Sequence, residues 1–173
     1  MTEAPSAARP NPFWDFSLRL YAAPAVQNAC LDLQDGSSVD VNVLLFVLYL
    51  ASTGRRITAA EARTVVAAIE PWRVDVVVPL RTARRNLKTP ATAIDATGAD
   101  SLRAIVNQAE LEAERLQQAA LFGLAATLGS PAAAAAAAPA NIEAYGAALG
   151  RQLAAGPVGV MLAAFQARES TTP

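Results

Sequence analysis

The sequence predicts an all-α fold: a compact, irregular and near-orthogonal bundle of about six to seven helices around a central apolar helix near residues 41–52. Helix caps and stop signals recur along the chain. Apolar residues mostly repeat with the period of an amphipathic helix. Residues 74–80 are the main strand candidate, and they have no second strand to pair with. A length of 173 residues, 53% of them hydrophobic, suffices for one domain with a real core.

The first helix is expected to follow residues 1–11, which we interpret as a disordered leader because they lack the apolar run of a signal peptide. Asn11 and Pro12 supply an N-cap and a first helical position. Pro24 interrupts the helix, because proline has no N–H and its ring crowds the preceding turn. A second short helix is expected over residues 24–34.

Residues 41–52 are the expected centre of the fold. Asp40 can cap this helix, and Gly54 can end it. The residues from 44 to 50 are all apolar or aromatic, so the helix has no polar face and is expected to be buried all round. A strand is the alternative for this run, but the cap and the length favour a helix.

The next helix begins with a capping box, in which Thr58 and Glu61 each satisfy a backbone N–H at the helix start. We expect Pro71 to end it. The following segment leaves two structures open for residues 74–80: a strand, which three consecutive valines favour, or a helix that restarts at Pro79. We favour the helix, because a lone strand has no ladder.

The longest helix is expected over residues 102–128, after a loop at 89–99 and a cap at Asp100 and Ser101. A regular apolar spacing predicts its buried face. That face would consist of Leu102, Ile105, Val106, Ala109, Ala113, Leu116, Ala120 and Leu124.

The C-terminal part begins with an alanine-rich stretch between prolines, residues 129–140, which we expect to form a linker with at most a turn or two of helix. Asn141 would then cap the last helices, over 142–153 and 158–167. The expected organisation is a helical domain over 12–128, with C-terminal helices within 141–168 packing on the same domain.

Composition excludes several classes of function. The chain has no histidine, which removes every His-based triad and His metal site, and its single cysteine excludes an internal disulfide and a thiolate zinc cage. We expect no catalytic set, no cofactor and no metal. A net charge of −1 argues against a nucleic-acid partner, and the densest apolar run is too short to span a membrane. We therefore expect a cytoplasmic protein.

The strongest charge pattern is a stripe of Arg81, Arg84, Arg85 and Lys88, which helical spacing places on one face. One interpretation is an anion site, because arginine forks match carboxylate and phosphate oxygens two at a time. The other is a solvated face paired with the glutamates of the longest helix, Glu110, Glu112 and Glu114.

Two further features have a functional and a structural interpretation each. The aromatic cluster Phe13, Trp14 and Phe16 could form a surface for a partner, or it could pack the first helix onto the core. Cys30 has no histidine to activate it, and we interpret it as a structural thiol. Asn42, at the start of the central helix, needs a hydrogen-bond partner if it is buried.

Several segments resemble a family of small bacterial proteins that carries a domain of unknown function. They are FWDFSLRLY at 13–21, VQNACLDLQD at 26–35 and DVNVLLF at 40–46, with PLRTARR at 79–85 and ELEAERL at 110–116 further along. The resemblance covers residues 12–128 and omits the alanine-rich tail. It implies a bacterial, cytoplasmic origin, and no activity, cofactor or catalytic residue can be transferred from it.

Two hypotheses about function follow. The first is a non-enzymatic helical protein that binds another protein, with homo-oligomerisation as one form, since no catalytic side-chain set accompanies the patterned helices. The alternative is a binder of a small anionic ligand, or an enzyme, that uses Arg81, Arg84 and Arg85 facing Glu110 and Glu114. The alternative requires these groups to converge on a concave pocket.

Overall fold

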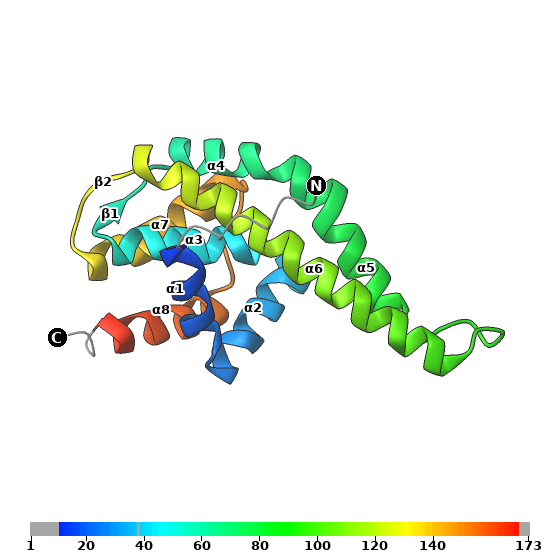
Figure 1. Cartoon of the computed structure of the whole chain (residues 1–173). Helices are drawn as coiled ribbons and strands as arrows, with labels where there is room; N and C mark the ends of the chain where they lie inside the picture. The colour runs from blue at the N-terminus through cyan, green and yellow to red at the C-terminus, as the bar shows by residue number, and fades with distance from the viewer. Residues whose placement is uncertain (1–10, 38, 170–173) are drawn as a thin grey trace.

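A computed structural model describes residues 11–37 and 39–169, so the expected leader lies outside the described residues apart from Asn11. The all-α prediction is confirmed. Within the described ranges the helices are α1 (Pro12–Tyr21), α2 (Pro24–Ser37), α3 (Val41–Ser52), α4 (Ala59–Trp72), α5 (Val78–Asn86), α6 (Ala96–Leu124), α7 (Ala134–Ala148) and α8 (Ala155–Glu169). Figure 1 shows α3 enclosed by the other helices.

The central position of α3 is confirmed. Asp40 caps it by accepting hydrogen bonds from the backbone N–H groups of Asn42 and Val43, and Gly54 follows its end with a φ of +74°. Most α3 side chains are buried, and Phe46 is 0% exposed. Helices α1, α2, α6 and α7 all contact α3, so its uniformly apolar surface is removed from water on every side.

Helices α1, α2 and α8 cover one side of α3 (Figure 1). Phe13 packs edge-on against Phe46 at 5.4 Å between ring centroids, and Phe16 packs edge-on against Phe165 of α8. Phe13 and Phe16 are therefore core residues and do not form the partner surface considered above. Only Trp14 of that cluster is part-exposed.

A single unbroken helical rod runs from α4 into α5 through a π-helical segment, Arg73–Val77. The expectation that Pro71 ends α4 is wrong, and the helical alternative for residues 74–80 is correct. The π segment widens the backbone before Pro79, whose ring would otherwise crowd the carbonyl one turn earlier. Contacts of α4 with α6 and α7 help to hold the rod together through both prolines.

Helix α6 differs most from the prediction. It starts at Ala96, with Asp95 as its cap, six residues before the expected start. The predicted buried face is also wrong, since Leu102, Ile105 and Leu116 are 49%, 63% and 45% exposed. The buried residues of α6 are Ala99 in its first half, with Glu110, Ala113, Gln117, Gln118 and Leu121 further along, and of these only Ala113 belonged to the predicted face. As Figure 1 shows, α5 and the first half of α6 extend from the bundle as an antiparallel arm.

The alanine-rich stretch is largely helical. Helix α7 begins at Ala134, inside the expected linker, and Ala137 and Ala138 are buried against the core. Asn141 is an interior residue of this helix rather than its cap. Its side chain accepts from the Ile57 backbone N–H at 2.8 Å and donates to the carbonyls of Val47 and Arg55 at 3.0 and 2.9 Å.

Two short strands depart from the purely helical expectation. β1 (Arg55–Arg56) pairs antiparallel with β2 (Ser130–Pro131), and this two-stranded sheet ties the loop after α3 to the loop before α7. Among the described residues, no helix is both long and apolar enough to cross a membrane.

Candidate functional site

The candidate site is a cavity of about 270 Å³ that α1, α2, α3, α5 and α6 enclose. Its apolar lining includes the part-exposed Trp14, the buried Leu45, and the exposed Leu18, Leu31 and Leu111. Arg81, Arg84 and Arg85 line it from α5, and Glu110 and Glu114 line it from α6. All five residues of the predicted anion site therefore converge on one concave surface, which also includes the predicted Trp14.

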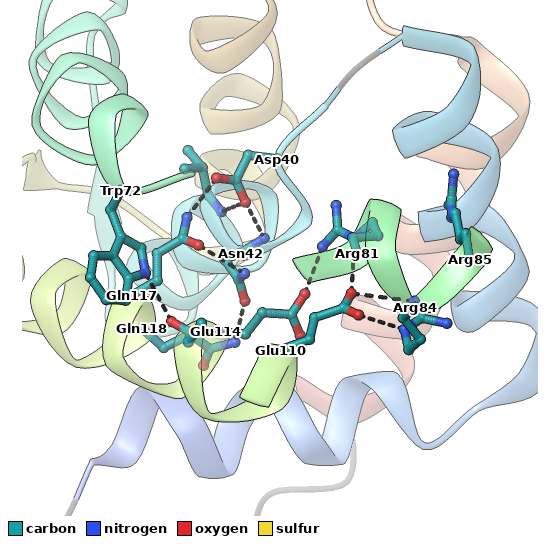
Figure 2. A network of polar contacts seen from close by, with 12 residues as sticks. Asp40, Asn42, Trp72, Arg81, Arg84, Arg85, Glu110, Glu114, Gln117 and Gln118 are labelled. Atoms are coloured by element: carbon teal, nitrogen blue, oxygen red, sulfur yellow. Dashed lines mark hydrogen bonds and ion pairs between the residues drawn. The ribbon is translucent and has the colours of Figure 1, made fainter. Parts of the chain in front are cut away.

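Glu110 is the centre of an ion-pair cluster in this wall (Figure 2). Its Oε1 accepts from Arg81 Nε at 3.0 Å, and its Oε2 accepts from Arg84 Nε at 2.5 Å. Arg81 Nη2 also donates to Glu114 Oε1 at 2.7 Å. The cluster arises because α5 and α6 run antiparallel and pack together. Arginines three and four residues apart on α5 therefore face glutamates four residues apart on α6.

The two glutamates differ in electrostatic environment. Burial alone would raise the pKa of Glu110, but hydrogen bonds from Arg84 and Arg81 outweigh it, so the pKa lies below the usual value for glutamate. Burial dominates at Glu114 and raises its pKa, because Arg81 compensates only in part. Bonding to Glu110 raises the pKa of Arg84.

Arg85 lies at the edge of the cluster. It donates to Asp35 Oδ1 of α2 at 2.8 Å, and its side chain is 45% exposed. Two other members of the predicted charge pattern lie outside the cavity lining. Lys88 is exposed on the arm, and Glu112 pairs with Arg115 on its own helix. The site therefore combines both sequence interpretations, since its arginines are paired with glutamates and also face a cavity.

A chain of side-chain amides lies next to the ion-pair cluster (Figure 2). Gln118 Nε2 donates to Asn42 Oδ1 at 2.8 Å, Asn42 Nδ2 donates to Gln117 Oε1 at 3.4 Å, and Gln117 Nε2 donates to Asp40 Oδ2 at 2.5 Å. The sequence indicated Asn42 as a residue that needs a partner. Gln117 and Gln118 were missed, because glutamine on a long helix is normally exposed and nothing in the spacing turns it inward.

Two residues of the cavity lining each have a buried polar atom without a hydrogen-bond partner among the described residues. These atoms are Ser17 Oγ of α1 and Gln118 Oε1 of α6, and each residue is 3% exposed. A buried polar atom without a partner costs roughly 1–3 kcal/mol, so native structures seldom leave one unsatisfied. Both atoms are therefore polar groups beside the cavity that the fold itself leaves unsatisfied.

Cys30 also lines the cavity and is inert as a nucleophile. Burial raises its pKa to about 12, so its thiol is protonated near neutral pH, and its Sγ lies 3.7 Å from Met161 Sδ. Asp40 serves as the cap of α3. Across the described parts of the chain, no three His, Cys, Asp or Glu residues group as they would around a metal ion.

Comparison with known proteins yields one match. The family model described as "Protein of unknown function (DUF2390)" matches residues 12–121, which are the helices from α1 through most of α6. No curated protein and no solved structure matches the chain.

Proposed function

Since the chain belongs to this family of unknown function, we propose its function from the cavity: the protein binds a small organic anion that has an apolar part. The observation that carries the proposal is the convergence of Arg81, Arg84 and Arg85 on one cavity with only two carboxylates, Glu110 and Glu114, in its lining. The lining therefore holds one more cation than carboxylates, which favours an anion.

The arginines retain capacity for a ligand. A guanidinium has five N–H groups, and the bonds to Glu110 and Glu114 use two groups of Arg81 and two of Arg84. The glutamates also hold both guanidiniums in place, so little side-chain entropy is lost when an anion binds. A carboxylate or a phosphate would complete these forks.

The rest of the lining suits an apolar body. Trp14 and Leu45 supply apolar surface on one side, and Leu31 and Leu111 supply it on others. A cavity of about 270 Å³ suits a small molecule rather than a macromolecule. We propose binding rather than a reaction, since Cys30 is protonated and the chain has no histidine to act as a base.

Tryptophan fluorescence and calorimetry test the proposal. The chain has two tryptophans, so Trp72→Phe leaves Trp14 as the single reporter in the cavity wall. We expect octanoate, phenylacetate or N-acetyl-leucine to change its emission saturably, and octanamide to bind more weakly than octanoate. Arg85→Gln should weaken binding of the acid about tenfold, because one charge-assisted contact is lost.

The matched control is Arg103→Gln, which removes an arginine of α6 that pairs with Asp100 outside the cavity. It should leave binding unchanged. Equal affinity for octanoate and octanamide, or no heat and no change in emission with any of the three acids, would rule out an anion site.

A second candidate function is self-association through the outer face of α6. Leu102, Ile105 and Leu116 form an exposed apolar stripe there, and Ala109 between them leaves room for a second helix to approach. We propose a second copy of this chain as the occupant. Light scattering should then give a dimer mass that Ile105→Glu reduces to a monomer, whereas a monomeric wild-type chain at high concentration would exclude it.

A further inference from the structure

The amide chain has a fixed direction because its last member is a carboxylate. Asp40 Oδ1 accepts from the backbone N–H groups of Asn42 and Val43, and Asp40 Oδ2 accepts from Gln117 Nε2. Burial raises the pKa of the Asp40 carboxyl, whereas its hydrogen bonds from Gln117, Asn42 and Val43 and the charge of Arg73 lower it. In its ionised form the carboxylate can only accept hydrogen bonds. Gln117 must therefore turn its amide nitrogen toward Asp40 and its oxygen toward Asn42.

The same constraint applies to each amide group in turn, from Gln117 through Asn42 to Gln118 in the cavity lining. Because Gln117 Oε1 faces Asn42, Asn42 must present its nitrogen there and its oxygen to Gln118. Gln118 must then present its nitrogen to Asn42, which leaves its Oε1 as the atom without a partner. If any one amide group were rotated by half a turn, two donors or two acceptors would face each other in a buried place. Such an arrangement costs free energy, because no other group there can complete the lost hydrogen bonds.

Asp40 itself does not line the cavity, whereas Asn42 and Gln118 do. Gln117, Gln118 and Asn42 are 1%, 3% and 6% exposed, so water competes little with these bonds. The carboxylate at one end thus determines which kind of hydrogen-bonding atom the cavity presents at the other end, and it does so without contact with a ligand.

We propose that the bound anion carries an N–H or O–H group that donates to Gln118 Oε1, and that Asp40 acts as the positioning residue for this preference through Gln117 and Asn42. The ligand class is a hydroxy- or amido-substituted organic acid. Its anionic group faces Arg81 and Arg84, and its donor group faces Gln118. The inference rests on the proposed binding of an anion in this cavity and adds the second recognition element.

The test uses pairs of acids that differ only in an amide N–H or an ester oxygen, namely N-acetyl-leucine with O-acetyl-leucic acid and the corresponding pair with a phenylalanine side chain. In the wild-type protein the amide should bind about tenfold more tightly than the ester, because the ester leaves the buried acceptor unpaired. The quantity compared is the ratio of the two dissociation constants, measured by calorimetry.

Asp40→Asn should invert that ratio. The new side chain has nearly the same shape and keeps an oxygen for the cap of α3, but it presents a nitrogen to Gln117. Gln117, Asn42 and Gln118 must each turn over, and Gln118 then presents its nitrogen to the cavity. The ester should now bind at least as well as the amide. A loss of negative charge near the site affects both acids equally and cancels in the ratio.

Two further variants complete the experiment. Asp32→Asn makes the same chemical change at an exposed position of α2 and should leave the ratio unchanged. Gln118→Met removes the acceptor with little change in volume and should bring the ratio to one, which tests the inference independently of the folding of Asp40→Asn.

The outcomes separate the inference from the proposed function. If acids bind but the amide-to-ester ratio is near one in the wild-type protein, the proposed hydrogen bond to Gln118 is wrong. If Asp40→Asn leaves the ratio unchanged, the proposed role of Asp40 is wrong. In both cases the anion site remains. If neither acid pair binds and octanoate and phenylacetate also fail to bind, the proposed anion site is wrong. The inference about Asp40 and Gln118 is then wrong as well, because it rests on that site.

Discussion

At the scale of single residues, Glu110 joins α6 to α5 through two arginines. The residue is 5% exposed, and the side chains of Arg81 and Arg84 are 16% and 24% exposed. Removal of one member of a largely buried ion pair is costly, because the partner charges lose their compensation in a place that water reaches poorly. Glu110 is therefore the member of the cluster whose loss should be measured first.

Glu110→Gln should lower the free energy of unfolding by about 2 kcal/mol at pH 7. The pKa of Glu110 is lowered in the folded state, so the folded state binds fewer protons than the unfolded state in the window between the two pKa values. The stabilisation is full above the unfolded pKa, roughly 4.3 for glutamate, and it is lost as the pH falls through the lower folded pKa.

Urea unfolding of both proteins from pH 7 down to pH 3 checks this expectation. Glu112→Gln is the matched control, because Glu112 is exposed and pairs only with its helical neighbour Arg115. A difference between wild type and Glu110→Gln that stays constant down to pH 3 would contradict the assignment.

At the scale of elements, α6 shows why apolar spacing alone misassigned a face. Its N-terminal half packs on α5 in the arm (Figure 1), and Leu102 and Ile105 in this half are exposed. Glu110, Gln117 and Gln118 turn inward because α5 and α3 offer partners for their polar atoms. Hydrogen bonding across the interface thus decided the orientation of the helix against its apolar pattern.

This orientation predicts that substitutions at two apolar residues of α6 change the free energy of unfolding by very different amounts. Ile105→Glu should change the free energy of unfolding by at most about 0.5 kcal/mol, since Ile105 is 63% exposed. Leu121→Ala should cost about 3 kcal/mol, because Leu121 is fully buried and its loss leaves a cavity. Thermal and urea unfolding measure both, and a large destabilisation by Ile105→Glu would show that the predicted face is the buried one after all.

Other elements were predicted from local signals. The cap of α3 at Asp40, the capping box of α4 and the start of α1 at Asn11 are all present. Each depends on residues within three or four positions of one another, so the sequence contains the whole interaction. Pro71 misled in the other direction, because the helical rod continues past it through a π-helical segment.

At the scale of the whole molecule, Asn141 connects three distant segments. It is 0% exposed, and it satisfies the backbone of Ile57, Val47 and Arg55 at once. These bonds join α7 to the middle of α3, to β1 and to the residue that follows β1. An apolar residue of similar size would bury the same area, but it would leave the Ile57 N–H unpaired and remove one hydrogen bond from each of the two carbonyls.

Asn141→Ala should therefore destabilise the protein by about 3 kcal/mol, from one orphaned N–H and two weakened carbonyls. Hydrogen exchange at the Ile57 amide should accelerate by more than global unfolding explains, because its acceptor is gone. Asn28→Ala, at an exposed position of α2, is the control and should have little effect. An unchanged unfolding midpoint for Asn141→Ala would contradict this role.

The sequence by itself determined the helical class, the central place of α3, the caps of α1, α3 and α4, and the residues of the charge cluster. These follow from periodicity and from contacts within one or two turns, which a chain carries in its order of residues. Only the tertiary structure decided that the arginines and glutamates face a cavity, that Gln118 lines it, and that hydrogen bonds through Gln117 and Asn42 connect Gln118 to Asp40. Those properties depend on which helices pack together. The hydrogen bonds of Gln117 to Asp40 and of Gln118 to Asn42 join residues more than seventy positions apart, and the spacing of residues within one helix cannot predict them.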